Sequence, residues 1–225
     1  MGRRQGNAHG RRKADVVVRS VAIALIVIGA FMLLYNGYQW WDQIRVAVHD
    51  PELAMSIADN WDDRNWQKPL KQGVDTDWKP EIGEEIGQLI IPRIGAILPI
   101  IEGTDEEELA KGVGHYVGWG TVLPGETGHA VLSGHRDTVF RRAGELKDGD
   151  RLYVKMKDGN VYTYQIRKRW ITHAEDRTVI VPKKEPILTL TTCYPFDYVG
   201  NAPDRYIIQS ELIEVRTPAA NQRLK

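Results

Sequence analysis

The chain has 225 residues, with 30 basic and 30 acidic side chains, so its formal net charge is zero. Residues 1–19 hold six Lys or Arg and one Asp, so the rest of the chain is acidic and gives no reason to expect a nucleic-acid partner. The single cysteine excludes a disulfide within the chain.

An apolar segment near the N-terminus is predicted to be a transmembrane signal anchor over residues 20–36. All residues from Ser20 to Tyr35 are uncharged, and with Val16–Val18 the stretch reaches about 20 residues, enough to cross a bilayer. An aromatic group follows instead of a cleavage site: Tyr35, Tyr38, Trp40 and Trp41. The basic flank predicts a cytoplasmic tail over residues 1–19 and an extracellular remainder; the alternative is a buried core helix.

Residues 37–85 are interpreted as an extracellular stalk, from which some tryptophans could pack back on the domain. The segment is polar and charged and lacks a sustained strand period. A helix over Trp41–Val48 or over Pro51–Asp59 fits the pattern. For the second helix, Asp50 would be the N-cap and Pro51 the first helical residue.

Residues 86–216 are predicted to form one mainly β domain, followed by a C-terminal tail over 217–225. Short apolar runs are separated by Gly and Pro, which indicates seven or eight strands in a closed barrel or a sandwich. The expected strands are Gly87–Ile91, Ala96–Glu102, His129–Ser133, Arg151–Met156, Val161–Trp170, Ile187–Thr192 and Arg205–Val215.

Three local patterns refine this domain. Lys157–Asn160 predicts a hairpin turn with Asp-Gly at its centre. The alternation that starts at Val161 is typical of a half-buried strand. Thr104 is expected to be the N-cap of a short helix over the acidic run 105–108, and Val139–Leu146 could form another. The acidic run could instead bind calcium, but it lacks the spacing of an EF-hand, so we expect no metal site and no cofactor.

The only cysteine, Cys193, ends a run of strand-forming residues two positions before Pro195. A thiol at a strand end lies at the rim of a domain. In an oxidising compartment a lone cysteine is coincidental, pairs between molecules, or is a working thiol.

Of the six histidines, His135 has the context expected of a catalytic partner. It follows a short strand in a polar turn, Ser133–Thr138, so the imidazole also lies at a strand end. The alternative is a structural histidine. His9 and His49 lie in the tail and the stalk, and His173 is most simply a solvated loop residue; the other two, His115 and His129, are expected to be hydrogen-bonded structural residues.

Three segments, in order, resemble the His, Cys and Arg motifs of the sortases: Ser133–Thr138, Thr189–Phe196 and Ala202–Tyr206. The Thr-Cys-Tyr-Pro-Phe form is most similar to class D, and the basic tail and anchor fit as well. The resemblance covers about Ile86 to Glu214. It implies an eight-stranded β-barrel with short helices and a cysteine transpeptidase whose catalytic residues are Cys193, His135 and Arg205.

The resemblance also implies roles and partners. Cys193 would form a thioester, His135 would donate and accept the proton, and Arg205 would stabilise the oxyanion or the substrate backbone. The substrate would be a secreted protein with a Leu-Pro-any-Thr-Gly or Ala signal, cut after Thr and passed to a peptidoglycan amine. Thr192 would help the oxyanion or substrate, or be structural. The loop Thr172–Lys184 would shape the substrate groove, with walls from Val179, Ile180, Val181 and Pro182.

Two other functions stay open on these residues. The first is a cysteine hydrolase that releases free acid without amine transfer, and the second is a membrane-tethered binding module with a fortuitous cysteine. A pilin-polymerising sortase would carry an Asp-Pro-aromatic lid before the barrel. The nearest segments, Asp50–Glu52 and Asp77–Lys79, do not match, which favours anchoring of single proteins.

Overall fold

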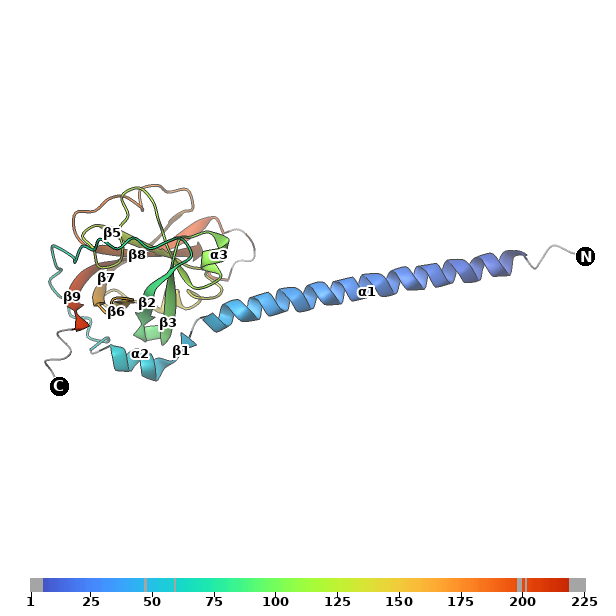
Figure 1. Cartoon of the computed structure of the whole chain (residues 1–225), viewed down its shortest axis with the longest axis horizontal. Coiled ribbons are helices and arrows are strands. Elements are labelled where there is room, and N and C mark those ends of the chain that lie inside the picture. The colour runs from blue at the N-terminus through green and yellow to red at the C-terminus, as the bar shows by residue number, and fades with distance from the viewer. Residues whose placement is uncertain (1–5, 47, 59, 198–199, 201, 219–225) are drawn as a thin grey trace, which may run out of the picture. The chain divides into compact units, whose positions relative to one another are not determined.

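The computed structural model describes residues 6–46, 48–58, 60–197, 200 and 202–218 (Figure 1). The chain divides into two compact units, of which the first ends at Asp42 and the second begins at Gln43. The first five residues of the expected basic tail and residues 219–225 of the expected C-terminal tail lie outside the described residues.

One long helix, α1 (Gly6–Val46), makes up the described part of the first unit and continues into the first residues of the second. Its apolar part, Val16–Gln39, has 24 residues and is long and apolar enough to cross a membrane. The helix is longer at both ends than the predicted span of 20–36. It continues through the aromatic group after Tyr35, and the helix expected over Trp41–Val48 is the end of α1 rather than a separate element.

Most of the expected stalk belongs to the second unit. β1 (Val48–His49) adds to the barrel, and α2 (Pro51–Ile57) begins as predicted, because the Asp50 carboxylate accepts a hydrogen bond of 3.0 Å from the Leu53 N–H. Ala54 packs in a small buried cluster on the barrel surface. The segment is therefore attached to the barrel and is not a free spacer.

Eight strands close the barrel in the order β3-β2-β6-β7-β9-β8-β5-β4, and β4 returns to β3. The pairs β3–β4 and β5–β8 are parallel, and the other pairs are antiparallel. The strands are β2 (Glu85–Ile91), β3 (Ala96–Glu102), β4 (Val113–His115), β5 (His129–Ser133), β6 (Arg151–Met156), β7 (Val161–His173), β8 (Ile187–Tyr194) and β9 (Asp204–Arg216). The mainly β fold and the eight-stranded barrel are thus confirmed. The prediction missed β4 and β1.

The barrel interior is filled by aliphatic and aromatic side chains that alternate along each strand. On β8 the inward residues include Leu188 and Leu190, and on β9 they include Ile208 and Leu212. On these two strands, odd-numbered residues of β8 and of the first part of β9 therefore face outward. This alternation decides which side chains reach the outer surface at the strand ends.

The polypeptide before the barrel, residues 60–84, runs along the outside of the sheet as a strap. The Leu70 N–H donates to the Leu212 carbonyl, and the Val74 N–H donates to the Gly125 carbonyl, both at 2.8 Å. Trp78 packs against the main core. The tryptophan packing that the sequence suggested is therefore present.

The strap changes the burial of β7. The sequence pattern predicted one buried and one exposed face, but Thr163 and Gln165 are fully buried on the expected exposed face. The Gln165 amide accepts from the Gln67 N–H at 2.9 Å and donates to the Asn65 carbonyl at 2.9 Å. The half-buried interpretation is wrong there because the strap covers the outer face.

The short connections match the predicted local patterns with two corrections. The hairpin turn at Lys157–Asn160 is confirmed, with Gly159 at a φ of 86°. The helix α3 (Glu106–Leu109) has Asp105 at its N-cap, so the prediction of Thr104 is wrong by one residue. The expected helix over Val139–Leu146 is reduced to a single 3₁₀ turn, η2 (Ala143–Glu145). A second 3₁₀ turn, η1 (Pro92–Ile94), joins β2 to β3.

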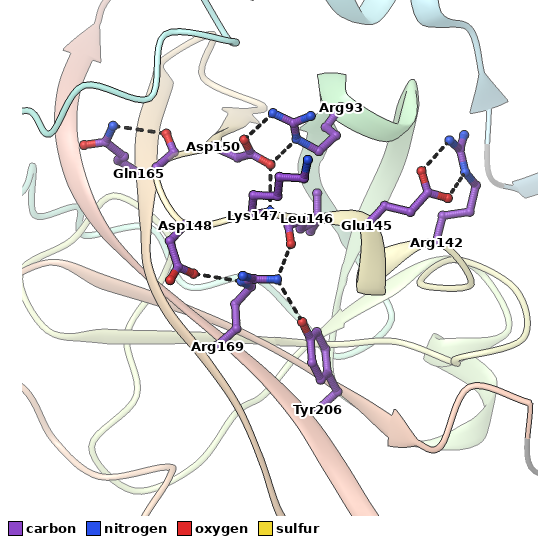
Figure 2. Close-up of polar contacts among 11 residues, drawn as sticks. Arg93, Arg142, Glu145, Leu146, Lys147, Asp148, Asp150, Gln165, Arg169 and Tyr206 are labelled. Carbon is purple, nitrogen blue, oxygen red and sulfur yellow. Dashed lines mark hydrogen bonds and ion pairs between the residues drawn. The ribbon is translucent and has the colours of Figure 1, made fainter.

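A polar network ties the η2 region to the neighbouring strands (Figure 2). The Arg93 guanidinium binds the buried Asp150 carboxylate in bidentate fashion. Arg169 of β7 donates to the Asp148 carboxylate at 2.8 Å, to the Leu146 carbonyl and to the Tyr206 hydroxyl at 3.4 Å. Through Tyr206 this network reaches the start of β9.

Candidate active site

The cysteine lies on the outer face of the sheet near the end of β8. In the antiparallel pairing of β8 with β9, Cys193 is directly opposite Arg205. Directly opposed residues of an antiparallel pair point to the same face, so the sulfur and the guanidinium extend from the same side. Cys193 is a free, half-buried thiol, as the prediction of a rim position required.

The predicted histidine reaches the same place through the parallel pair β5–β8. Ser133 is level with Thr191, and the Gly134 N–H still donates to the Thr191 carbonyl at 3.2 Å. His135 follows two residues after the end of β5, on the same side as the Cys193 end of β8. The three predicted residues line one cavity of about 300 Å³, whose described walls are His135, Arg136, Asp137, Cys193, Gly200, Ala202 and Arg205.

Two arginines fix the loop between β8 and β9 beside this cavity. The Arg136 guanidinium donates to the Gly200 carbonyl at 2.7 Å. Arg205 donates from Nη1 to the carbonyls of Ala202 at 3.2 Å and of Asp204 at 3.0 Å. These bonds go to backbone oxygens and not to the carboxylates that a surface ion pair would use.

Thr192 points away from the cavity. As the neighbour of Cys193 it faces the barrel interior, where it is 5% exposed, and its hydroxyl donates to the Gly134 carbonyl at 2.7 Å. The bond joins the end of the cysteine strand to the residue before His135. Of the two roles that the sequence left open for Thr192, this geometry supports the structural one.

A cluster of three aromatic side chains packs together at the end of β8 and the start of β9. Tyr194, Phe196 and Tyr206 have ring centroids 5.3–6.1 Å apart. The Phe196 ring also packs closely against Gly144 in η2. Because Tyr206 bonds Arg169, the aromatic group is connected to the polar network of Figure 2.

A long loop, residues 174–186, leads from the cavity along the outer face of β8. It begins beside the site, where the Ala174 N–H donates to the Pro203 carbonyl at 2.9 Å, and it ends at Ile187, the first residue of β8. A second cavity of about 680 Å³ lies between this loop and the chain after β4. Its walls are Tyr116, Trp119, Ala174, Glu175, Asp176, Arg177 and Ile180.

Of the four predicted groove walls, Ile180 lines this second cavity. Val179 is buried, and the Val181 carbonyl bonds His129. Pro182 packs against Gly120, where an added Cβ would lie 2.4 Å from its ring. These three residues hold the loop in place, so the prediction of all four as walls is not supported.

The opposite wall was not predicted. Tyr116 and Trp119 lie in the connection after β4, and the Trp119 side chain is 84% exposed. The signal in the sequence was weak: Trp119 lies between Gly118 and Gly120, and a single exposed aromatic residue is too common to identify a wall.

The other barrel histidines are structural, as expected. His115 is buried, with Nδ1 2.7 Å from a Glu102 carboxylate oxygen and Nε2 2.9 Å from the Val122 carbonyl. His129 is fully buried, with Nδ1 2.8 Å from the Val181 carbonyl and Nε2 2.7 Å from the Thr189 hydroxyl. Burial lowers the pKa of His129, and the nearby Lys183 charge lowers it further.

One acidic side chain in the wall of the second cavity, Asp176, is held by local hydrogen bonds. The Asp176 carboxylate accepts from the Thr172 hydroxyl and from the backbone and hydroxyl of Thr178. These bonds lower the pKa of Asp176 to about 2. Asp176 is therefore ionised in the neutral range.

The structure gives no grouping that would hold a metal within its described residues, where no three His, Cys, Asp or Glu side chains come together. The acidic run that suggested calcium is divided among different neighbours. Glu107 pairs with Lys111 at 2.9 Å, and Glu108 is buried. Glu106 lies 3.6 Å from His135.

The chain is similar in sequence to known proteins of one family. The sortase domain family matches residues 89–213. The chain is 53% identical over 204 residues to Sortase D of Bacillus subtilis (strain 168), a match that covers 85% of the chain and 98% of that protein. It is 29% identical over 232 residues to Sortase SrtE1 of Streptomyces coelicolor, covering 95% of the chain and 62% of that protein.

The structure is also similar to solved structures of proteins from the same family. The catalytic domain of B. anthracis SrtD is 50% identical, with a TM-score of 0.55, and the match covers 64% of the chain and 97% of that domain. A Clostridium perfringens Sortase D5 transpeptidase is 29% identical, with a TM-score of 0.53, over 60% of the chain and 83% of that structure.

Proposed function

Because the chain belongs to the sortase family, as a class D cysteine transpeptidase, we propose that it anchors secreted proteins to the cell wall. It cuts a Leu-Pro-any-Thr-Gly or Ala sorting signal after the Thr and transfers the protein to an amine of a peptidoglycan precursor. The observation that carries the proposal is the single cavity lined by Cys193, His135 and Arg205.

The first half-reaction forms a thioester. The Cys193 thiolate attacks the Thr carbonyl carbon, and the negative charge moves to the carbonyl oxygen. The fork of N–H donors on Arg205, on the same face as the sulfur, stabilises that oxyanion or the substrate backbone. His135 gives its proton to the departing amine as the C–N bond breaks, which leaves the thioester and the free C-terminal peptide.

The second half-reaction reverses these roles. An incoming amine attacks the thioester carbonyl, the neutral imidazole of His135 accepts the proton, and the Cys193 thiolate leaves. The new amide bond joins the sorted protein to the amine. Release of free acid instead would require water to compete with the amine at the same carbon, and a cavity with restricted access disfavours that outcome.

The sorting signal binds along the outer face of β8 toward Cys193. The 174–186 loop and the Tyr116–Trp119 wall enclose the larger cavity on that path. Ile180 and Trp119 supply apolar surface for the Leu and Pro side chains of the signal.

The apolar part of α1 anchors the enzyme in the cell membrane as a single pass. The basic flank before it stays in the cytoplasm and the barrel lies outside, where sorting signals and wall precursors meet. No nucleic acid or cofactor is required by this chemistry.

Single proteins, rather than pilin subunits, are the substrates. The segments nearest to a lid motif have other positions: Asp50–Glu52 starts α2, and Trp78 packs on the core. Neither contributes to the described walls of the cavity that holds Cys193.

The test is a peptide-library cleavage assay with the full-length enzyme, with and without an amine acceptor, in which mass spectrometry traps the acyl-enzyme. We expect thioester formation on Cys193 and amine-dependent product. Cys193→Ala and His135→Ala abolish transfer. Arg205→Lys loses about 10²–10³-fold, because a point charge does not replace a planar fork.

Arg141→Lys is the matched control, since Arg141 is exposed and is not part of either cavity wall, and it keeps full activity. Free acid as the only product, whether or not amine is added, would replace the proposal with a cysteine hydrolase. If the wild-type chain formed neither acyl-enzyme nor product with any peptide, only the binding module would remain.

A further inference from the structure

The acidic run before β4 places one carboxylate beside the active-site histidine. Its other members are occupied elsewhere. Asp105 is at the N-cap position of α3, Glu107 pairs with Lys111, and Glu108 is 6% exposed and packs against Gly103. Glu106, the first residue of α3, lies with its Oε1 atom 3.6 Å from Nε2 of His135.

The position of Glu106 is set by the barrel and not by a flexible loop alone. α3 follows β3 directly, and its first turn is closed by the bond from the Leu109 N–H to the Asp105 carbonyl at 3.0 Å. After it, β4 pairs with both β3 and β5, the strand that leads into His135. Glu106 therefore lies just before β4 and His135 just after β5, and these two strands are neighbours in one closed sheet.

We propose that Glu106 is a positioning residue for His135, which orients the imidazole from its Nε2 side and stabilises its charged form. The inference rests on the proposed function, because it matters only if His135 is the proton donor. A Cys–His pair needs the imidazolium beside the thiolate before it can protonate the departing amine. A carboxylate beside Nε2 pairs with the imidazolium and restrains the orientation of the ring.

The size of the effect follows from exposure. His135 is 28% exposed at its side chain and Glu106 is 81% exposed. Water screens such a pair, so we expect a two- to fivefold contribution to kcat/KM, the range for exposed ion pairs. The effect should shrink as salt is added.

The neighbour Glu107 offers a matched control. It has the same side chain, is 80% exposed, and pairs with Lys111 instead of His135. Glu106→Gln and Glu107→Gln make the same change in net charge one residue apart. Full-length enzyme is assayed for amine transfer across pH. Glu106→Gln should lower kcat/KM two- to fivefold and move one limb of the pH profile to lower pH, whereas Glu107→Gln should match wild type.

A second readout does not depend on turnover. Since Cys193 is the only cysteine, its rate of alkylation by iodoacetamide reports the thiolate at this site alone. Glu106→Gln should slow alkylation near neutral pH, because the imidazolium that stabilises the thiolate loses its partner carboxylate. In a His135→Ala background the same change should leave alkylation unchanged or speed it, since only the direct repulsion between two negative charges remains.

The outcomes separate this inference from the proposed function. Identical pH profiles for Glu106→Gln and wild type, or equal shifts in both Gln variants, would overturn the role of Glu106 and leave the enzyme assignment intact. Slower alkylation from Glu106→Gln in the His135→Ala background would also overturn it. Full transfer activity in His135→Ala would instead refute the proposed function.

Discussion

The buried hydroxyl of Thr192 gives the sharpest test of how the active site is held together. Thr192→Val keeps the shape of the side chain and removes the donor to the Gly134 carbonyl, which is 2.7 Å away in a buried setting. Such a bond contributes about 1 kcal/mol, and a buried carbonyl left without a partner costs about 1–3 kcal/mol. We expect the free energy of unfolding to fall by about 1–3 kcal/mol.

Thr192→Ser is the matched control. It keeps the hydroxyl and removes one methyl group, which costs about 1 kcal/mol or less at a buried site. The measurement is urea unfolding of the full-length chain in detergent, followed by tryptophan fluorescence, with kcat/KM for amine transfer in parallel. Thr192→Val should be the less stable and the less active variant, because Gly134 directly precedes His135.

Two results would contradict this reasoning. If Thr192→Val unfolded like wild type but formed little acyl-enzyme, the hydroxyl would act on the substrate and not on the fold. If Thr192→Ser were the more damaging change, the methyl group and not the hydrogen bond would be the important part of the side chain.

Two further predictions concern the strap and the groove loop. Gln165→Leu should lower the free energy of unfolding by at least about 2 kcal/mol, since its buried amide bonds the strap at Gln67 and Asn65; limited proteolysis should then cut near residue 65 first, and an uncut strap would refute the coupling. Burial lowers the pKa of His129, so the unfolded chain takes up a proton below about pH 6.5 while the folded chain resists it, and folding stability falls as pH drops through that range. His129→Gln should show a smaller drop in unfolding midpoint between pH 7 and pH 5, and an equal drop would show that another group is responsible.

The strands could be predicted where the sequence repeats a local signal. β3, β5 and β6 have the predicted bounds because each is an apolar run between turn residues. β4 was missed because it has three residues, one of them Gly114, and is too short to show a period. What covers β7 could not be predicted at all, because Gln67 is 98 residues from Gln165 in the sequence.

The active site likewise combines residues that local signals identify with an arrangement that only the fold produces. Cys193 and His135 could be located at strand ends from residue type alone, and Arg205 came from the resemblance to a family. Their meeting in one cavity depends on the pairing of β8 with both β5 and β9, which no local pattern contains. Of the four predicted groove walls only Ile180 is among the described walls of the larger cavity, because an apolar run such as Val179–Pro182 does not reveal which of its members face a cavity and which face the protein.

The register of β8 is therefore the feature on which the function depends most. Side chains alternate along a strand, so a slip of one residue against β5 and β9 would turn Cys193 inward and bring Thr192 to the outer face. The Thr192 hydroxyl has a partner only in the native register, where the Gly134 carbonyl is within 2.7 Å. A slip of one residue would place Cys193 at the inward position that Thr192 holds, and the buried Gly134 carbonyl would lose its donor. The same hydrogen bond that steadies His135 thus also selects the one strand alignment in which the sulfur, the imidazole and the guanidinium share a face.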